Sequence, residues 1–234
     1  MSAAVESLDA ILAGPHVWRG QGNASSAVPG IATGYAELDV LLPGRGWPVG
    51  ALTEIFVERP GIGELQLLVP AAAQLTGNKR WLAMIAPPYL PYAPAMAALG
   101  IHLKHMLLLN PQSRDEQAWA AEQLLGSGNC GAMLLWNDHL QDRTLRRLQH
   151  AAEHSGALAV LFRTRRAQPF ASTALRLHVS RSNGRTVIRV LKRRGGGVPA
   201  PVQLDLHASL IRRGSVAPQQ KPVAAANDRL QHVQ

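Results

Sequence analysis

The sequence predicts an α/β fold in which helices cover both faces of a mostly parallel central sheet that ends in an antiparallel edge. Two observations support this prediction. Short apolar runs alternate with helical patterns along the middle of the chain, and these runs are continuous, as in strands buried on both faces. After Ala171 the helical patterns stop and strand patterns follow one another directly. We therefore expect βαβ units followed by antiparallel strands.

The sequence also predicts where the individual strands and helices lie. At the C-terminal side, Asn183-Gly184 is typical of a tight hairpin turn, and it separates the strand patterns 175–179 and 186–191, before a last strand at 203–206. The earlier strands are expected at residues 51–57, 81–86, 105–109, 132–136 and 158–162, and the helices at 64–75, 94–99, 115–125 and 142–154.

Composition divides the chain into three parts. Residues 1–30 are expected to form an N-terminal helix and loop segment, and residues 31–212 the folded core. Residues 213–234 are rich in Pro, Gln, Ala and Val without periodicity, which is typical of a disordered tail.

Charge is distributed unevenly over the 234 residues. Residues 1–140 hold 7 basic and 11 acidic side chains, whereas residues 141–234 hold 17 basic and 4 acidic ones, which favours an anionic partner for the C-terminal part. The single cysteine, Cys130, excludes an intramolecular disulfide and fits a reducing compartment. No apolar stretch is suited to a membrane span or a signal peptide. We expect a soluble, cytoplasmic protein without membrane contact.

Three segments resemble a known family. Residues 33–39 (TGYAELD) and 44–56 (GRGWPVGALTEIF) resemble the start of a RecA recombinase core, where a Leu-Asp helix, a Gly-rich turn and a Glu-Ile strand lead into the phosphate loop. Residues 189–194 (RVLKRR) resemble the last strand of that core and its basic turn. With a truncated core and no C-terminal DNA-binding domain, the sequence is most similar to the ImuA family, the RecA/SulA-like accessory proteins of bacterial mutagenic translesion synthesis.

This resemblance implies a RecA-like core and a non-catalytic function in SOS-type DNA-damage tolerance. The implied partners are the RecA recombinase, the polymerase-like adaptor ImuB and, indirectly, the alpha subunit of an error-prone replicative-type polymerase. Direct contact with DNA is a further hypothesis. The alternative is a SulA-like inhibitor of cell division that binds the tubulin-like protein FtsZ, because SulA shares the nucleotide-free RecA-like fold.

The expected phosphate loop departs from the pattern Gly-x4-Gly-Lys-Ser/Thr, in which backbone amides and lysine hold phosphates and the hydroxyl holds magnesium. Gly61 and Gly63 are present, but Glu64 stands at the lysine position and Leu65 at the Ser/Thr position. A carboxylate repels a triphosphate, and leucine has no oxygen for magnesium. We therefore interpret this loop as a degenerate nucleotide site.

The second nucleotide-binding position is also degenerate. A metal-binding aspartate is expected at the end of the strand 132–136, but Trp136 stands there and the first carboxylate is Asp138. A strand-end cap explains Asp138 better than a magnesium ligand does. From both positions we expect a protein that is not an enzyme and that binds no nucleotide cofactor and no metal.

Two groups of basic residues are candidates for binding a partner or DNA. The first group lies on the last long strand and in the turn after it, and the second follows the strand 158–162, at the edge where clefts open in parallel sheets. A charged edge that prevents strand pairing is the alternative explanation. The groups are Arg189, Lys192, Arg193 and Arg194, and Arg163, Arg165 and Arg166.

Two short patterns have simpler explanations than the functions they suggest. His150, Glu153 and His154 match a zinc-protease pattern, but no downstream glutamate supplies the third ligand, so a solvated helix face is favoured. Residues 203–206 (QLDL) resemble the start of a sliding-clamp-binding peptide without its closing aromatic residue, and an edge strand explains them.

Overall fold

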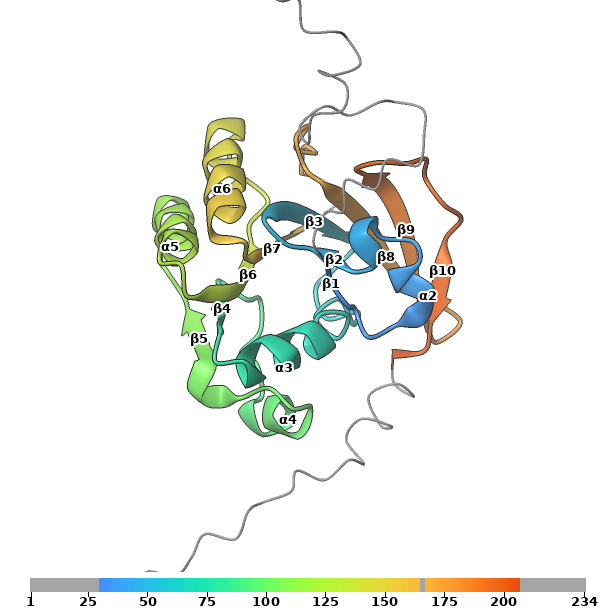
Figure 1. The fold of residues 1–234 in the computed structure, drawn as a ribbon, viewed down its shortest axis with the longest axis horizontal. Helices are drawn as coiled ribbons and strands as arrows, with labels where there is room; N and C mark the ends of the chain where they lie inside the picture. Colours follow the sequence, from blue (N-terminus) through green and yellow to red (C-terminus); the bar gives the residue numbers. More distant parts are fainter. Residues whose placement is uncertain (1–29, 165–166, 207–234) are drawn as a thin grey trace, which may run out of the picture.

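The computed structural model describes residues 30–164 and 167–206 (Figure 1). The helix expected near the N-terminus and the tail at 213–234 lie outside the described residues, as do Arg165 and Arg166. Among the described residues, no helix is long and apolar enough to cross a membrane.

An eight-stranded sheet forms the centre of the fold, in the order β10-β9-β8-β3-β7-β6-β4-β5. The strands from β8 to β5 pair in parallel, whereas β8 with β9 and β9 with β10 pair antiparallel. The predicted α/β fold with a mostly parallel sheet and an antiparallel edge is confirmed. The strands are β3 (Ala51–Val57), β4 (Trp81–Ile85), β5 (Met106–Leu109), β6 (Cys130–Trp136), β7 (Leu158–Thr164), β8 (Leu175–Ser182), β9 (Arg185–Arg193) and β10 (Val202–Leu204).

Helices pack on both faces of this sheet, as the sequence predicts. α3 (Val69–Gly77) and the short α2 (Ala36–Asp39) contribute to an apolar core on one face, and α5 (Arg114–Gly126) and α6 (Asp142–Ser155) to a second core on the other face (Figure 1). The remaining short elements are β1 (Gly30–Ile31), η1 (Pro43–Arg45), β2 (Trp47–Pro48), α4 (Ala93–Ala98) and η2 (Leu103–His105).

The helix expected at residues 64–75 begins later than predicted. α3 starts at Val69, and residues 64–68 form turns, in the first of which the Gln66 N–H donates to the Gly63 carbonyl oxygen at 3.1 Å. Pro70 explains the difference. Proline has no N–H and its ring clashes with the preceding turn, so it fits only at the start of a helix.

The antiparallel edge turns at the predicted dipeptide. Asn183 and Gly184 join β8 to β9 with φ angles of 50° and 76°. Positive φ at both central residues is the mark of a type I′ turn, whose twist matches that of paired strands. The hairpin signal in the sequence is therefore confirmed.

The end of α3 generates a stability prediction. Lys79 has a φ of 61°, and the Arg80 N–H donates to the Leu75 carbonyl oxygen at 3.0 Å, closing the helix. A side chain in this left-handed conformation costs about 1–2 kcal/mol, which glycine avoids. Glycine also gains entropy in the unfolded chain, which offsets part of this relief. We therefore expect Lys79→Gly to raise the free energy of unfolding by about 0.5–1 kcal/mol, measured by urea titration.

Lys104 provides the control for this prediction, because its φ is not positive. Lys104→Gly should lower the free energy of unfolding by about 0.5–1 kcal/mol. A lower stability of both variants would contradict backbone strain at Lys79.

Candidate functional site

The degenerate phosphate loop is closed by its own glutamate. Glu64, at the position of the phosphate-binding lysine, is 4% exposed, and its Oε1 accepts a hydrogen bond of 2.8 Å from the Gly61 N–H. Gly61 and Gly63 have φ angles of 86° and 108°, a conformation open to glycine but strained for other residues. The carboxylate therefore engages a loop N–H of the kind that binds phosphate in nucleotide-binding loops.

Packing also holds this loop against the sheet. Leu206 is buried, Leu65 packs against the same core, and a Cβ at Gly63 would lie only 3.3 Å from Leu206 Cδ1. The Tyr35 hydroxyl donates to the Gln66 carbonyl oxygen at 3.2 Å and fixes the loop from the α2 side. Leu65 thus contributes apolar packing at the position where a nucleotide-binding loop carries a metal-binding hydroxyl.

Trp136 and Asp138, at the end of β6, have structural partners. The Trp136 ring stacks on Phe162, with centroids 4.6 Å apart and an interplanar angle of 18°. The Asp138 carboxylate accepts hydrogen bonds from Thr164, at 2.6 Å from the N–H and 2.7 Å from the hydroxyl, so it joins the ends of β6 and β7. Within residues 30–164 and 167–206, no group of three His, Cys, Asp or Glu side chains is placed to hold a metal.

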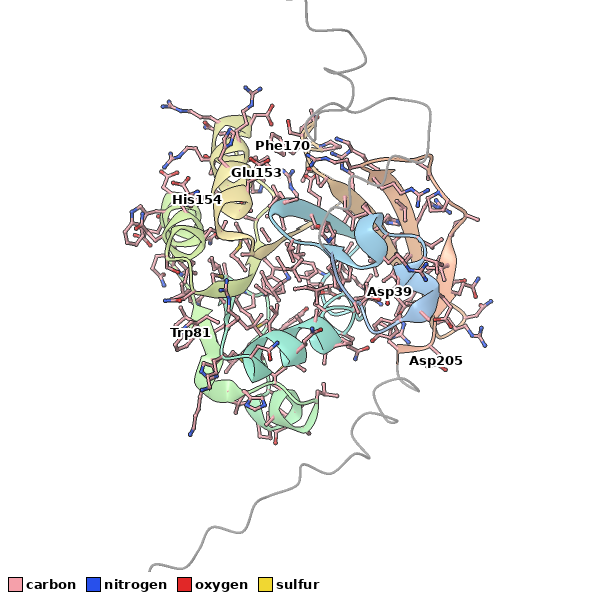
Figure 2. The ribbon with its side chains drawn as sticks, in the orientation of Figure 1. Asp39, Trp81, Glu153, His154, Phe170 and Asp205 are labelled. Carbon is pink, nitrogen blue, oxygen red and sulfur yellow. The ribbon has the colours of Figure 1, made fainter. Side chains whose placement is uncertain are left out.

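A buried network of charged and polar groups surrounds Glu54, in the centre of β3. Glu54 is 0% exposed, and its Oε1 accepts from Arg163 Nη1 at 2.8 Å. Its Oε2 accepts from Arg176 Nε and from the Thr173 hydroxyl, both at 2.9 Å. The N–H of Phe170, labelled in Figure 2, donates to Oε1 at 3.2 Å. One carboxylate thereby joins β3, β7, β8 and the chain that leads into β8.

Arg163 is therefore buried within the sheet and does not present the accessible charge that we expected at this strand end. It is 3% exposed and also donates to the carbonyl oxygens of Asp138 at 3.0 Å and Gln168 at 2.7 Å. The difference arises because β7 continues to Thr164, which places Arg163 inside the sheet. The available signal was Glu54 itself, since a carboxylate within an apolar strand requires a buried cationic partner.

The other basic group does not form one exposed cluster. Arg193 Nη1 donates to the Leu41 carbonyl oxygen at 2.8 Å, and Lys192 Nζ donates to the Ala171 carbonyl oxygen. Burial and the neighbouring Arg176 lower the pKa of Lys192. Both side chains are half-buried and hold the end of β9 to other segments.

Arg189 and Arg194 are the exposed members of this group. They stand on opposite sides of a β-bulge, because Arg176 pairs with Lys192 whereas the next residue of β8 pairs with Val190, leaving Leu191 as an extra residue. The bulge interrupts the side-chain alternation of β9. Of the four expected contact residues, these two retain freely accessible charges.

The reactive side chains of the α5–α6 face show no catalytic arrangement. His150 Nδ1 lies 3.3 Å from Glu153 Oε2 on α6, where Glu153 and His154 are labelled in Figure 2. Glu153 Oε1 also accepts a hydrogen bond of 2.8 Å from Gln149. Cys130 is 1% exposed, and burial raises the pKa of its thiol to about 12, so the sulfur stays protonated and unreactive at neutral pH.

A hollow lies at the carboxyl ends of β3, β6 and β7, and we call it the strand-end hollow. One part, of about 270 Å³, has Val57, Pro60, Pro88, Trp136 and Phe162 among its lining residues. A second part, of about 890 Å³, is continuous with it because the two share five lining residues. These are Arg114, Asp138, His139, Arg163 and Thr164.

Comparisons with known proteins match part of this chain. The family of the cell division inhibitor SulA matches residues 50–159. SulA of Edwardsiella piscicida is 27% identical over 130 residues, which are 53% of this chain and 77% of that SulA. RecA of Rhodopirellula baltica is 32% identical over 107 residues, which are 45% of this chain. This part of the chain is therefore similar to SulA and RecA proteins.

The extent of these matches differs between the two kinds of relative. SulA of Pectobacterium atrosepticum is 28% identical over 142 residues, 60% of this chain and 76% of that SulA, whereas the matched part of the Rhodopirellula RecA is 28% of its length. The SulA family match includes the degenerate loop and Glu54 but ends within β7. Strands β8, β9 and β10 follow after the residues of the family match.

The Glu54 network generates a second stability prediction. Glu54→Gln removes the negative charge between two arginines, and we expect a loss of about 3–5 kcal/mol in the free energy of unfolding, because Arg163 is left buried without a counter-charge. Glu37→Gln, on the exposed side of α2, should change the free energy by less than about 0.5 kcal/mol.

Combining Glu54→Gln with Arg163→Met should recover part of this loss, since the unpaired buried charge is then absent. Urea denaturation followed by circular dichroism measures all three variants. A loss below about 1 kcal/mol for Glu54→Gln would contradict the structural importance that we assign to this carboxylate.

Proposed function

We propose that the protein acts by binding other proteins of the DNA-damage response and does not turn over a nucleotide. The supporting observation is the closed loop around Glu64. A triphosphate would have to displace a buried carboxylate from the Gly61 N–H, and the Ser/Thr position for magnesium holds Leu65. Asp138 is bound to Thr164. Since the nucleotide site that the RecA-like resemblance implies is degenerate, we assign protein binding to the surface of the molecule.

SulA-like inhibition of cell division is the activity that the comparisons support best. The SulA family match covers residues 50–159, and the SulA proteins of Edwardsiella and Pectobacterium match over 77% and 76% of their own lengths. The implied partner of such an inhibitor is FtsZ. Binding would sequester FtsZ from the division ring and leave the cells as filaments.

A second candidate is the ImuA-like function, in which the partners are RecA and ImuB. It is favoured by the part of the chain beyond the SulA family match at residues 50–159. There β8, β9 and β10 extend the sheet on the far side of β3 and carry the exposed side chains of Arg185 and Arg189. A SulA-like inhibitor would not require this basic extension, whereas a partner of a nucleic-acid-bound recombinase could use it.

Expression in cells without DNA damage separates the two candidates. We expect filamentous cells and binding of the purified full chain to FtsZ, measured by biolayer interferometry, if division inhibition is the function. Cells of normal length together with binding to RecA or ImuB would instead establish the second candidate. Binding to none of the three proteins would refute the protein-binding function.

The closed loop makes a separate prediction about nucleotides. About 1 mM MgATP should leave the thermal unfolding midpoint of the protein unchanged. For comparison, a nucleotide site with a Kd of about 10 µM would add about 2.7 kcal/mol of stability at this concentration. Glu64→Gln provides the control for charge repulsion alone and should also show no shift, since lysine and a metal-binding hydroxyl are still missing. Saturable stabilisation of the unmodified protein would overturn the interpretation of a closed site.

A further inference from the structure

The segment between β4 and α4 exposes large apolar side chains. Tyr89, Leu90 and Tyr92 are 68%, 82% and 71% exposed. The sequence contains no Asp, Glu, Lys or Arg between Arg80 and Lys104. Within α4 only Met96 is buried, so alanines and a proline continue the apolar surface. A contiguous apolar surface next to a hollow is typical of a protein-binding site.

This segment is held in a defined conformation. Ala86 follows β4 with a φ of 51°, and its N–H donates to the Leu109 carbonyl oxygen at 2.8 Å. The Tyr89 ring lies over the degenerate loop, since its Cε2 is 3.5 Å from the position of a Cβ at Gly61. Prolines at 87, 88, 91 and 94 restrict the backbone further. A restricted loop loses little entropy when a partner binds.

The exposed segment borders the strand-end hollow. Pro88, which precedes Tyr89, lines the smaller part of the hollow together with Pro60 of the degenerate loop and Trp136 of β6. A volume of about 270 Å³ is sufficient for one large apolar side chain. Tyr89 and Leu90 follow Pro88 in the chain, next to an opening into which a partner can insert such a side chain.

The accessible charges of the smaller part of the hollow favour an acidic partner, whereas the exposed Glu58 lines the larger part only. Arg114 and His139 line both of its parts and are exposed, and within residues 30–164 and 167–206 neither side chain takes part in a hydrogen bond or ion pair. Asp138 and Arg163 are already bound to Thr164 and Glu54. An approaching carboxylate therefore meets an unpaired guanidinium.

We propose that residues 87–92 and the strand-end hollow form one docking surface for a segment of a partner protein that carries a large apolar side chain close to a carboxylate. The apolar side chain inserts between Pro60, Pro88 and Trp136, and the carboxylate pairs with Arg114. Tyr89 and Leu90 cover the inserted side chain and exclude water, as residues around an interface anchor do. This inference rests on the proposed protein-binding function and assigns the surface that performs it.

The test uses the full chain with purified FtsZ, RecA and ImuB in biolayer interferometry. For the partner that binds the unmodified protein, Tyr89→Ser with Leu90→Ser should raise the Kd at least tenfold, and Arg114→Glu should do the same. Added salt should weaken binding of the unmodified protein more than binding of Arg114→Glu, because that variant lacks the cationic contact.

Matched controls lie on other parts of the surface. Trp119, 63% exposed on α5, is the apolar control as Trp119→Ser, and Arg146→Glu on α6 is the charge control. Both should keep the Kd within twofold, and every variant should keep the thermal midpoint of the unmodified protein. About 1 mM MgATP should not compete with the partner.

The outcomes separate the docking surface from the function on which it rests. If the unmodified protein binds none of the three partners, the proposed function fails. If it binds one and the Tyr89, Leu90 and Arg114 variants bind equally well, the function stands and the docking surface is refuted. Equal losses in the control variants, or competition by MgATP, also refute it, since they indicate another interface or a nucleotide as the occupant.

Discussion

The buried carboxylate of Glu54 is the constraint on which the arrangement of the sheet depends. β3 lies between the parallel strand β7 and the strand β8, where the antiparallel edge begins, and Glu54 binds an arginine on each side, Arg163 at 2.8 Å and Arg176 at 2.9 Å. A buried charge without partners costs several kcal/mol. The two neighbours of β3 and the chain segment with Phe170 and Thr173 must therefore assemble together around this side chain.

The region of the expected nucleotide site is occupied by internal contacts. Glu64 binds the Gly61 N–H, and Asp138 binds Thr164, so two carboxylates serve to hold a loop and to join two strand ends. Because these carboxylates are hydrogen-bonded within the fold, the smaller part of the hollow presents Pro60, Pro88, Trp136 and Phe162 together with Arg114, whose guanidinium has no partner among the described residues. Such a surface suits an amphipathic protein segment better than a triphosphate and its metal ion.

The basic C-terminal part shows why net charge does not translate directly into a binding surface. Arg163 neutralises a buried carboxylate, Lys192 and Arg193 hold backbone carbonyl groups, and Arg189 and Arg194 remain exposed. A basic side chain near a strand end has several donors and a long apolar stem, so tertiary neighbours decide whether it supports the fold or faces solvent.

The sequence by itself determined the elements whose causes are local. Continuous apolar runs specified the parallel strands, Asn183-Gly184 specified the hairpin, and Glu64 and Leu65 ruled against a standard phosphate loop. The tertiary structure alone decided the pairing of Glu54 with arginines 109 and 122 residues away, the internal bond of Glu64, and the meeting of Tyr89 with the loop at Gly61. These depend on contacts between segments distant in the chain, and such contacts leave no periodic pattern in the sequence.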